Sequence, residues 1–204
     1  MEFGAAAAVA LHGCQNAGLF GTWCTVIADS DFGNLQLAHG LWQNGLHGIM
    51  MIKMGHGGFP KQHLADHLEG KEHGSHVVST LSDGDEKYTA VGWHGKSDHL
   101  HGKKRGEHYI STFLATDCSM TTPGTPAEKK RHDQRGNRVA STFVNHPKLV
   151  EDYYGNKEGG TGMSTVDQNN KLWQYCLRIE DTMQTEDPWK WMICSVIGMW
   201  ETNA

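Results

Sequence analysis

Cys-x-x-Cys pairs, an excess of basic residues and long apolar runs are all missing from this sequence of 204 residues. Its five cysteines, an odd number without zinc-type spacing, favour reduced thiols inside a cell over a disulfide framework. The net charge of −5 excludes a basic field over the whole protein, although it leaves local basic patches open. No apolar run approaches the roughly 18 residues of a membrane helix. The sequence therefore predicts an intracellular protein that does not span a membrane.

The N-terminal quarter has the pattern of an α/β protein. An Ala-rich segment at 5–20 predicts a helix, and the β-branched residues at 25–28 (TVIA) predict a short buried strand. Leu and Trp residues at helical spacing predict a second helix over 35–45, and a second buried strand follows at 46–54. Because the connections are short, the two strands are expected to be adjacent and parallel. We assign residues 1–58 to the first part of the core.

The next hundred residues have a different composition. Residues 59–160 are polar and rich in Gly and His, which predicts a β/loop-rich insertion with little internal order. Its strand candidates are 75–81, 87–93 and 108–115, with turns at Asp83-Gly84 and Pro123-Gly124. Helical patterns return at 164–181 and 187–204. Residues 161–204 are therefore assigned to a C-terminal helical part of the core.

Two acids follow the first predicted strand. Asp29 comes directly after residues 25–28, and Asp31 lies two positions further on. We expect Asp31 to point to the start of the helix that follows, where the positive end of the helix dipole favours an acid. Ligands of open α/β sheets gather at the carboxyl ends of the strands, where an acid can hold a divalent cation against a phosphate. Alternatively, Asp29 or Ser30 caps the helix that follows. The spacing alone leaves both interpretations open.

Three segments resemble piggyBac-type transposases. Residues 26–64 (VIADSDFGNLQLAHGLWQNGLHGIMMIKMGHGGFPKQHL) resemble the second catalytic block, in which an Asp closes a strand and a helix leads to a G-L-x-x-I-x-x-V-K strand and a G-F-P-K turn. Residues 108–131 resemble the family's STC…T…PG segment. Residues 150–204 resemble its closing block, with a T-x-D-P-W turn and a G-M helix. The segments occur in the family's order, and the resemblance extends from about residue 20 to residue 204.

This resemblance implies a partial ribonuclease-H-like core of parallel strands and flanking helices, interrupted by the insertion. The family carries three acidic metal ligands, of which Asp29 matches the second and Asp167 the third. The implied cofactor is Mg²⁺ (or Mn²⁺), a hard cation that prefers oxygen ligands, and two such ions can drive phosphodiester displacement. The implied partner is DNA, both transposon ends and target. A nuclear location and a homodimer are implied as well.

The sequence departs from the family's pattern at its start. The family's first Asp lies on the first strand of the sheet, well before the block that matches Asp29. Here Glu2 is the sole acid among the first 28 residues, and these predict a helix. We therefore expect a partial or decayed copy that does not catalyse strand transfer by itself. The alternative is a non-catalytic DNA-binding or interaction module that descends from such an enzyme.

Two further groups of side chains are candidates for binding. Residues 128–138 (EKKRHDQRGNR) carry five basic residues against two acids, and phosphate contact by such a segment would not depend on DNA sequence. The candidates are Lys129, Lys130, Arg131, Arg135 and Arg138. A solvated loop is the alternative. The histidines at 94, 99, 101 and 108 suggest metal binding, but their spacing matches no structural zinc motif, which favours solvated loop residues.

Overall fold

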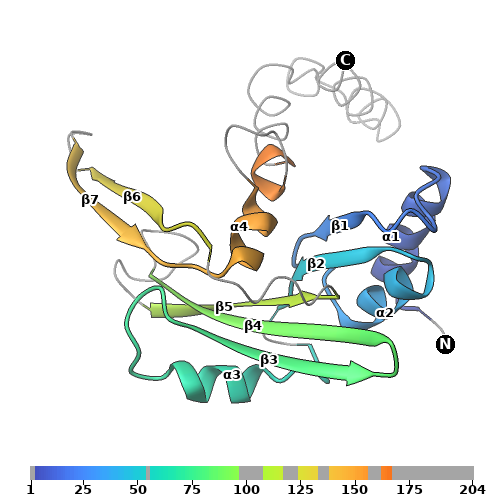
Figure 1. The fold of residues 1–204 in the computed structure, drawn as a ribbon, viewed down its shortest axis with the longest axis horizontal. Coiled ribbons are helices and arrows are strands. Elements are labelled where there is room, and N and C mark those ends of the chain that lie inside the picture. The colour runs from blue at the N-terminus through green and yellow to red at the C-terminus, as the bar shows by residue number, and fades with distance from the viewer. Residues whose placement is uncertain are drawn as a thin grey trace, which may run out of the picture. The chain divides into compact units, whose positions relative to one another are not determined.

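The computed structural model describes residues 3–53, 56–96, 108–116, 124–132, 138–155 and 162–166. The chain divides into two compact units, residues 1–153 and residues 154–204. Figure 1 shows the elements of the first unit and labels them in chain order. The helices and strands are α1 (Ala5–Asn16), β1 (Thr25–Ala28), α2 (Leu35–Gln43), β2 (His47–Met51), α3 (Lys61–Leu68), β3 (His76–Asp83), β4 (Glu86–Lys96), β5 (His108–Ala115), β6 (Ala127–His132), β7 (Arg138–Val144) and α4 (Lys148–Tyr154).

The strand–helix–strand unit at the N-terminus confirms the prediction from sequence. Strands β1 and β2 pair in parallel, with Thr25 opposite His47 and Ala28 opposite Met50. Helix α2 connects them and ends as expected at Asn44, which is followed by Gly45 at φ +66°. A glycine suits this position because side chains disfavour a positive φ. Local sequence signals therefore predict the order of these elements and the parallel pairing of the two strands.

The remaining strands of the five-stranded sheet come from the predicted insertion. The strand order is β1-β2-β5-β4-β3, and β5 pairs with β2 in the antiparallel direction. Strands β3, β4 and β5 form an antiparallel meander whose first turn is the predicted one at Asp83-Gly84. At 11 residues, β4 is longer than the short strand expected from the sequence. The sheet therefore runs across the boundary predicted at residue 58, and its class is mixed α/β.

Helices cover both faces of this sheet. Successive side chains along a strand point to opposite faces of the sheet. On one face, Met50, Ala90 and Leu114 belong to a core cluster with residues of α1, α2 and α3, such as Leu41 and Leu64. On the other face, the ring of Phe113 on β5 packs against Tyr153 of α4, with ring centroids 5.1 Å apart. The sheet is therefore the middle layer of the first unit.

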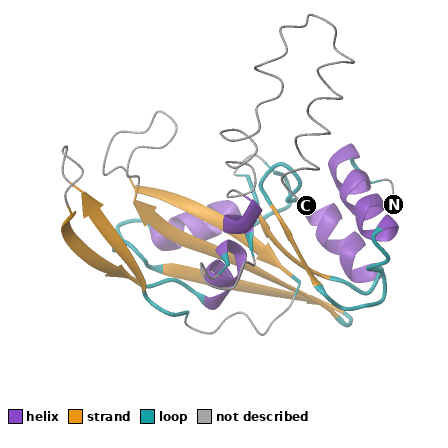
Figure 2. Cartoon of the chain, turned by 90° about the horizontal axis from the view of Figure 1, so that it is seen from above, coloured by secondary structure: helices purple, strands orange, loops and turns teal. Residues whose placement is uncertain are grey.

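Strands β6 and β7 form a separate two-stranded antiparallel sheet. Their hairpin lies beyond the end of the five-stranded sheet that is remote from α1 (Figures 1 and 2). The chain that follows β7 returns to the larger sheet, where the indole N–H of Trp93 donates a hydrogen bond to the carbonyl of Asn145 at 3.2 Å. Among the described residues, no helix is long and apolar enough to cross a membrane. Most of the helical part predicted at 161–204 lies outside the described residues.

We predict that truncation of the core destabilises the protein far more than the same truncation at the surface. Leu41 of α2 is fully buried, whereas Leu81 of β3 is 64 % exposed. Leu41→Ala should lower the free energy of unfolding by about 2–5 kcal/mol, because it leaves a cavity. Leu81→Ala should change it by less than about 0.5 kcal/mol. Urea denaturation measures both, and equal losses would contradict the assignment of α2 to the core.

Candidate functional site

Asp29 lies at the carboxyl end of the parallel strand β1, as the sequence predicted. Its Oδ1 accepts hydrogen bonds from the backbone N–H groups of Asp31 at 2.9 Å and Phe32 at 3.4 Å. Its carbonyl oxygen accepts a third, at 2.8 Å, from the N–H of Gly33. The half-buried carboxylate is thus fixed by the turn that follows it. Among the described residues, the hydrogen bonds to this carboxylate are made to Oδ1.

The structure corrects two expectations about this turn. Neither Asp29 nor Ser30 caps the next helix, because α2 is capped by Asn34, whose side chain accepts from the N–H of Leu37 at 2.8 Å. Asp31 does not point to the start of that helix either, since its carboxylate pairs with the ammonium of Lys53. The opposite charge lies within reach at the end of the neighbouring strand, whereas the effect of a helix dipole fades within the first turn of the helix.

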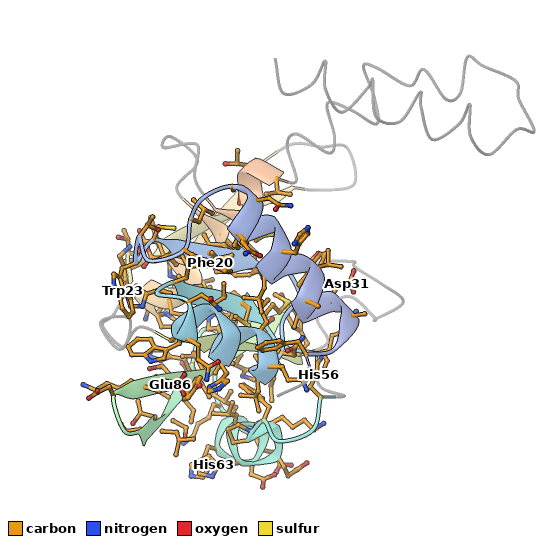
Figure 3. The ribbon with its side chains drawn as sticks, turned by 90° about the vertical axis from the view of Figure 1, so that its right-hand side faces the viewer. Phe20, Trp23, Asp31, His56, His63 and Glu86 are labelled. Carbon is orange, nitrogen blue, oxygen red and sulfur yellow. The ribbon has the colours of Figure 1, made fainter. Side chains whose placement is uncertain are left out.

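Lys53 and Gly33 are the residues at this site that sequence reasoning did not single out. Lys53 is the last residue of the G-L-x-x-I-x-x-V-K-like segment. This match to the family's pattern is the signal in the sequence that could have identified it. Gly33 is buried, and a Cβ atom there would collide with the carbonyl oxygen of Met51. The turn after Asp29 therefore lies directly against the end of β2. Figure 3 shows Trp23, which precedes β1, and Asp31, which follows it, on opposite sides of the view.

Asp167 lies outside the described residues, so its approach to Asp29 stays a prediction. Within the described ranges, no group of three or more His, Cys, Asp or Glu side chains could hold a metal ion. Asp29 alone offers a carboxylate, which suits Mg²⁺ or Mn²⁺ in chemistry but does not make a complete site. Further oxygen ligands have to come from elsewhere.

The basic residues predicted to contact DNA lie mainly on the β6–β7 hairpin. Lys129, Lys130 and Arg131 are on β6, Arg138 opens β7, and Arg135 lies outside the described residues. Residues 128–132 and 138 of the segment are therefore in paired strands, and their contact with DNA stays a prediction. The pairing shifts register between Arg131 and His132, where an irregularity interrupts the ladder.

The chain that enters β6 is anchored to α4. The N–H of Thr125 donates a hydrogen bond to Oε2 of Glu151 at 3.1 Å, and this bond lowers the pKa of the Glu151 carboxyl. The N–H of Gly124 donates to the carbonyl of His146 at 2.9 Å. These contacts fix the base of the hairpin that carries the basic residues.

Of the four histidines considered as metal ligands, the side chain of His94 alone is among those described. It is buried, and its Nδ1 lies 3.2 Å from the carbonyl oxygen of Glu72. His99 and His101 lie outside the described residues. For His94, the described geometry is that of a buried side chain bonded to the backbone.

Comparison with known proteins identifies a structural relative. No family model matches the chain, and no curated protein matches it significantly. Among solved structures, the cryo-EM structure of a piggyBac transposase synaptic complex with hairpin DNA matches with a TM-score of 0.58 and 14 % sequence identity. The match covers 97 % of this chain and 33 % of that one.

This match confirms the piggyBac resemblance that was identified from the sequence. The chain is a partial piggyBac-like copy in its fold, and it spans about a third of the length of the transposase that it matches. At 14 % identity the likeness is one of fold. The activity and the DNA contacts of the transposase therefore belong to the proposals below.

We predict opposite effects for one substitution at two glycines. Gly33→Ala should lower the free energy of unfolding by about 1–3 kcal/mol, because the new methyl group displaces the Asp29 turn from β2. Gly13→Ala, in the interior of α1 with no atom within 4 Å of the new methyl group, should raise it by about 0.5–1 kcal/mol. Denaturant titration of both variants measures this, and stabilisation by Gly33→Ala would refute the close packing of the turn.

Proposed function

We propose that this chain derives from a piggyBac-type transposase, a family whose reaction is metal-dependent cleavage and transfer of DNA strands. The fold match over 97 % of the chain carries this proposal. The order of the three sequence segments and the position of Asp29 at a strand end support it. We further propose that the ribonuclease-H-like core of the family underlies the five-stranded sheet, and that the protein acts in the nucleus as a homodimer.

In this proposal Asp29 and Asp167 are ligands of a divalent cation, Mg²⁺ or Mn²⁺. Such an ion, when bound, would polarise a phosphodiester and stabilise the leaving oxygen. The contribution of the chain is to position the oxygen ligands: the backbone N–H groups of Asp31 and Phe32 hold Oδ1 of Asp29, which leaves Oδ2 for the ion. The Lys53 ammonium holds the carboxylate of Asp31 in an ion pair.

The second candidate function is a non-catalytic DNA-binding module. In the sequence resemblance, Asp29 and Asp167 match two of the family's three acids. Three basic residues belong to β6 and a fourth begins β7, in a two-stranded sheet separate from the large one. We therefore propose that the 204-residue polypeptide binds DNA through its phosphates and does not cleave it.

Titration with Mn²⁺ tests the metal ligand. In the wild-type protein, Mn²⁺ should broaden the NMR amide signals of Ser30 and Asp31. Asp29→Asn should weaken this response at least about tenfold, because a neutral amide replaces a charged ligand while its oxygen can still accept the turn's hydrogen bonds. Asp31→Asn is the matched control and should respond as the wild type does. An unchanged response of Asp29→Asn would remove Asp29 from the metal site.

Binding of hairpin DNA, measured by fluorescence anisotropy at several salt concentrations, tests the basic segment. Lys129→Ala/Lys130→Ala should weaken binding and lower the slope of log K against log[salt] by about 0.9 for each phosphate that the variant no longer neutralises. Lys71→Ala/Lys87→Ala removes two exposed lysines, one that follows α3 and one on β4, and serves as the control of equal charge. Equal losses in the two double variants would show that net charge, and not this hairpin, governs binding.

A further inference from the structure

Helix α3 is fixed to the large sheet by its inner face. Leu64 and Leu68, four positions apart and therefore on one side of the helix, are both buried. A Cβ atom at Gly92 of β4 would lie 3.1 Å from the side chains of both leucines. This is closer than ordinary contact, so the missing side chain at Gly92 allows the helix to lie directly on the strand. The orientation of α3, and of the side chains on its outer face, is thereby set by the core.

Two histidines lie on the outer face of this helix. His63 and His67 are both exposed, and because they are four positions apart, their side chains are neighbours one turn apart. The centroids of the two rings are 4.2 Å apart, and the ring planes are inclined by 50°. Figure 3 shows His63 at the margin of the view, away from Asp31. The histidine pair is therefore separate from the turn that holds Asp29.

A backbone hydrogen bond defines the tautomer of His67. Its Nδ1 lies 2.8 Å from the carbonyl oxygen of His63, and because a carbonyl oxygen only accepts, Nδ1 carries the hydrogen. In the neutral ring the lone pair is then on Nε2. Histidines that bind metal ions typically have this arrangement, in which the other ring N–H donates to a carbonyl or a carboxylate. The helix therefore orients the ring of His67 as a metal ligand requires.

The distance between the rings suits one shared metal ion. Imidazole nitrogen binds a zinc ion at about 2.0–2.1 Å, so two nitrogens that share the ion are at most about 4 Å apart. Rings whose centroids are 4.2 Å apart lie close enough for one nitrogen of each to meet this limit. Imidazole is a preferred ligand of Zn²⁺, Ni²⁺ and Cu²⁺, whereas Mg²⁺ prefers oxygen. The donor pair therefore favours a transition metal.

This donor pair is not a complete protein cage. Among the described residues, no group of three or more His, Cys, Asp or Glu side chains could hold a metal ion. A structural zinc site has four protein ligands, so a site of two exposed histidines differs from it. The metal would add to a helix that Leu64 and Leu68 already hold in place, and it would not be needed for folding.

We propose that His63 and His67 bind one divalent transition-metal ion, such as Zn²⁺, on the outer face of α3. Nε2 of His67 and one ring nitrogen of His63 are the protein ligands, and water completes the coordination. This binding does not depend on the proposed DNA function. Its metal also differs in ligand preference from the Mg²⁺ or Mn²⁺ proposed at Asp29.

Titration of the complete 204-residue protein with Zn²⁺ tests the proposal. Because the chain has 14 histidines, the readout has to be local, and the ring ¹⁵N signals of His63 and His67 are followed by NMR. Both rings should shift along one saturation curve with a single Kd, and in His67 the signal of Nε2 should change more than that of Nδ1. Mg²⁺ at the same concentration should leave both rings unchanged.

Three variants locate the contact. His67→Ala should weaken Zn²⁺ binding at His63 at least about tenfold, because a single ring cannot chelate. Gln62→His/His67→Ala keeps the number of histidines but puts the second one beside His63, where the two side chains do not face each other, so the affinity should stay low. His12→Ala removes an exposed histidine of α1 and is the matched control, which should bind as the wild type does.

Three results would each overturn the proposal. The first is separate saturation curves for the two rings, or no shift of either ring, in the wild-type protein. The second is an equal affinity at His63 in the wild type and in His67→Ala. The third is recovery of the wild-type affinity in Gln62→His/His67→Ala, since this would show that any two histidines on α3 suffice.

Discussion

Strand β2 pairs through its backbone with a strand on each side. It runs parallel to β1 and antiparallel to β5. Two buried threonines, Thr112 on β5 and Thr116 directly after it, reinforce the antiparallel ladder between β2 and β5. The hydroxyl of Thr112 donates to the carbonyl of Ile52 at 2.6 Å, and the N–H of Gly48 donates to the hydroxyl of Thr116 at 2.8 Å. Because a buried backbone group without a partner is costly, these bonds tie the N-terminal unit to the meander of β3–β5.

This arrangement explains the position of Asp29. The turn that holds its carboxylate rests on the end of β2, where Gly33 contacts Met51 and Asp31 pairs with Lys53. If β2 were displaced, the turn would lose both its packing and its charge partner. A candidate ligand at a strand end is therefore held by the neighbouring strand as much as by its own, which is how a scaffold preorganises a site.

The same sheet also joins side chains that are far apart in the sequence. His39 and Glu86 are 47 residues apart in the sequence, and they meet because α2 precedes β2 and β4 lies two strands beyond it. The likeness to a third of a piggyBac transposase is one of fold, whereas this contact is observed between side chains of this chain alone.

Local interactions determined what could be read from the sequence. The β1–α2–β2 unit, the end of α2 at Asn44 and the turn at Asp83-Gly84 follow from side-chain periodicity and turn chemistry within a few residues, and all three were predicted correctly. The order of the piggyBac-like segments was also readable. Non-local interactions decided the rest. The pairing of β5 with β2, the ion pair of Asp31 with Lys53 and the meeting of His39 with Glu86 join distant segments, and no local pattern specifies which strand edges or charges come together. Only the folded sheet, by bringing these edges within hydrogen-bond distance, selects the partners.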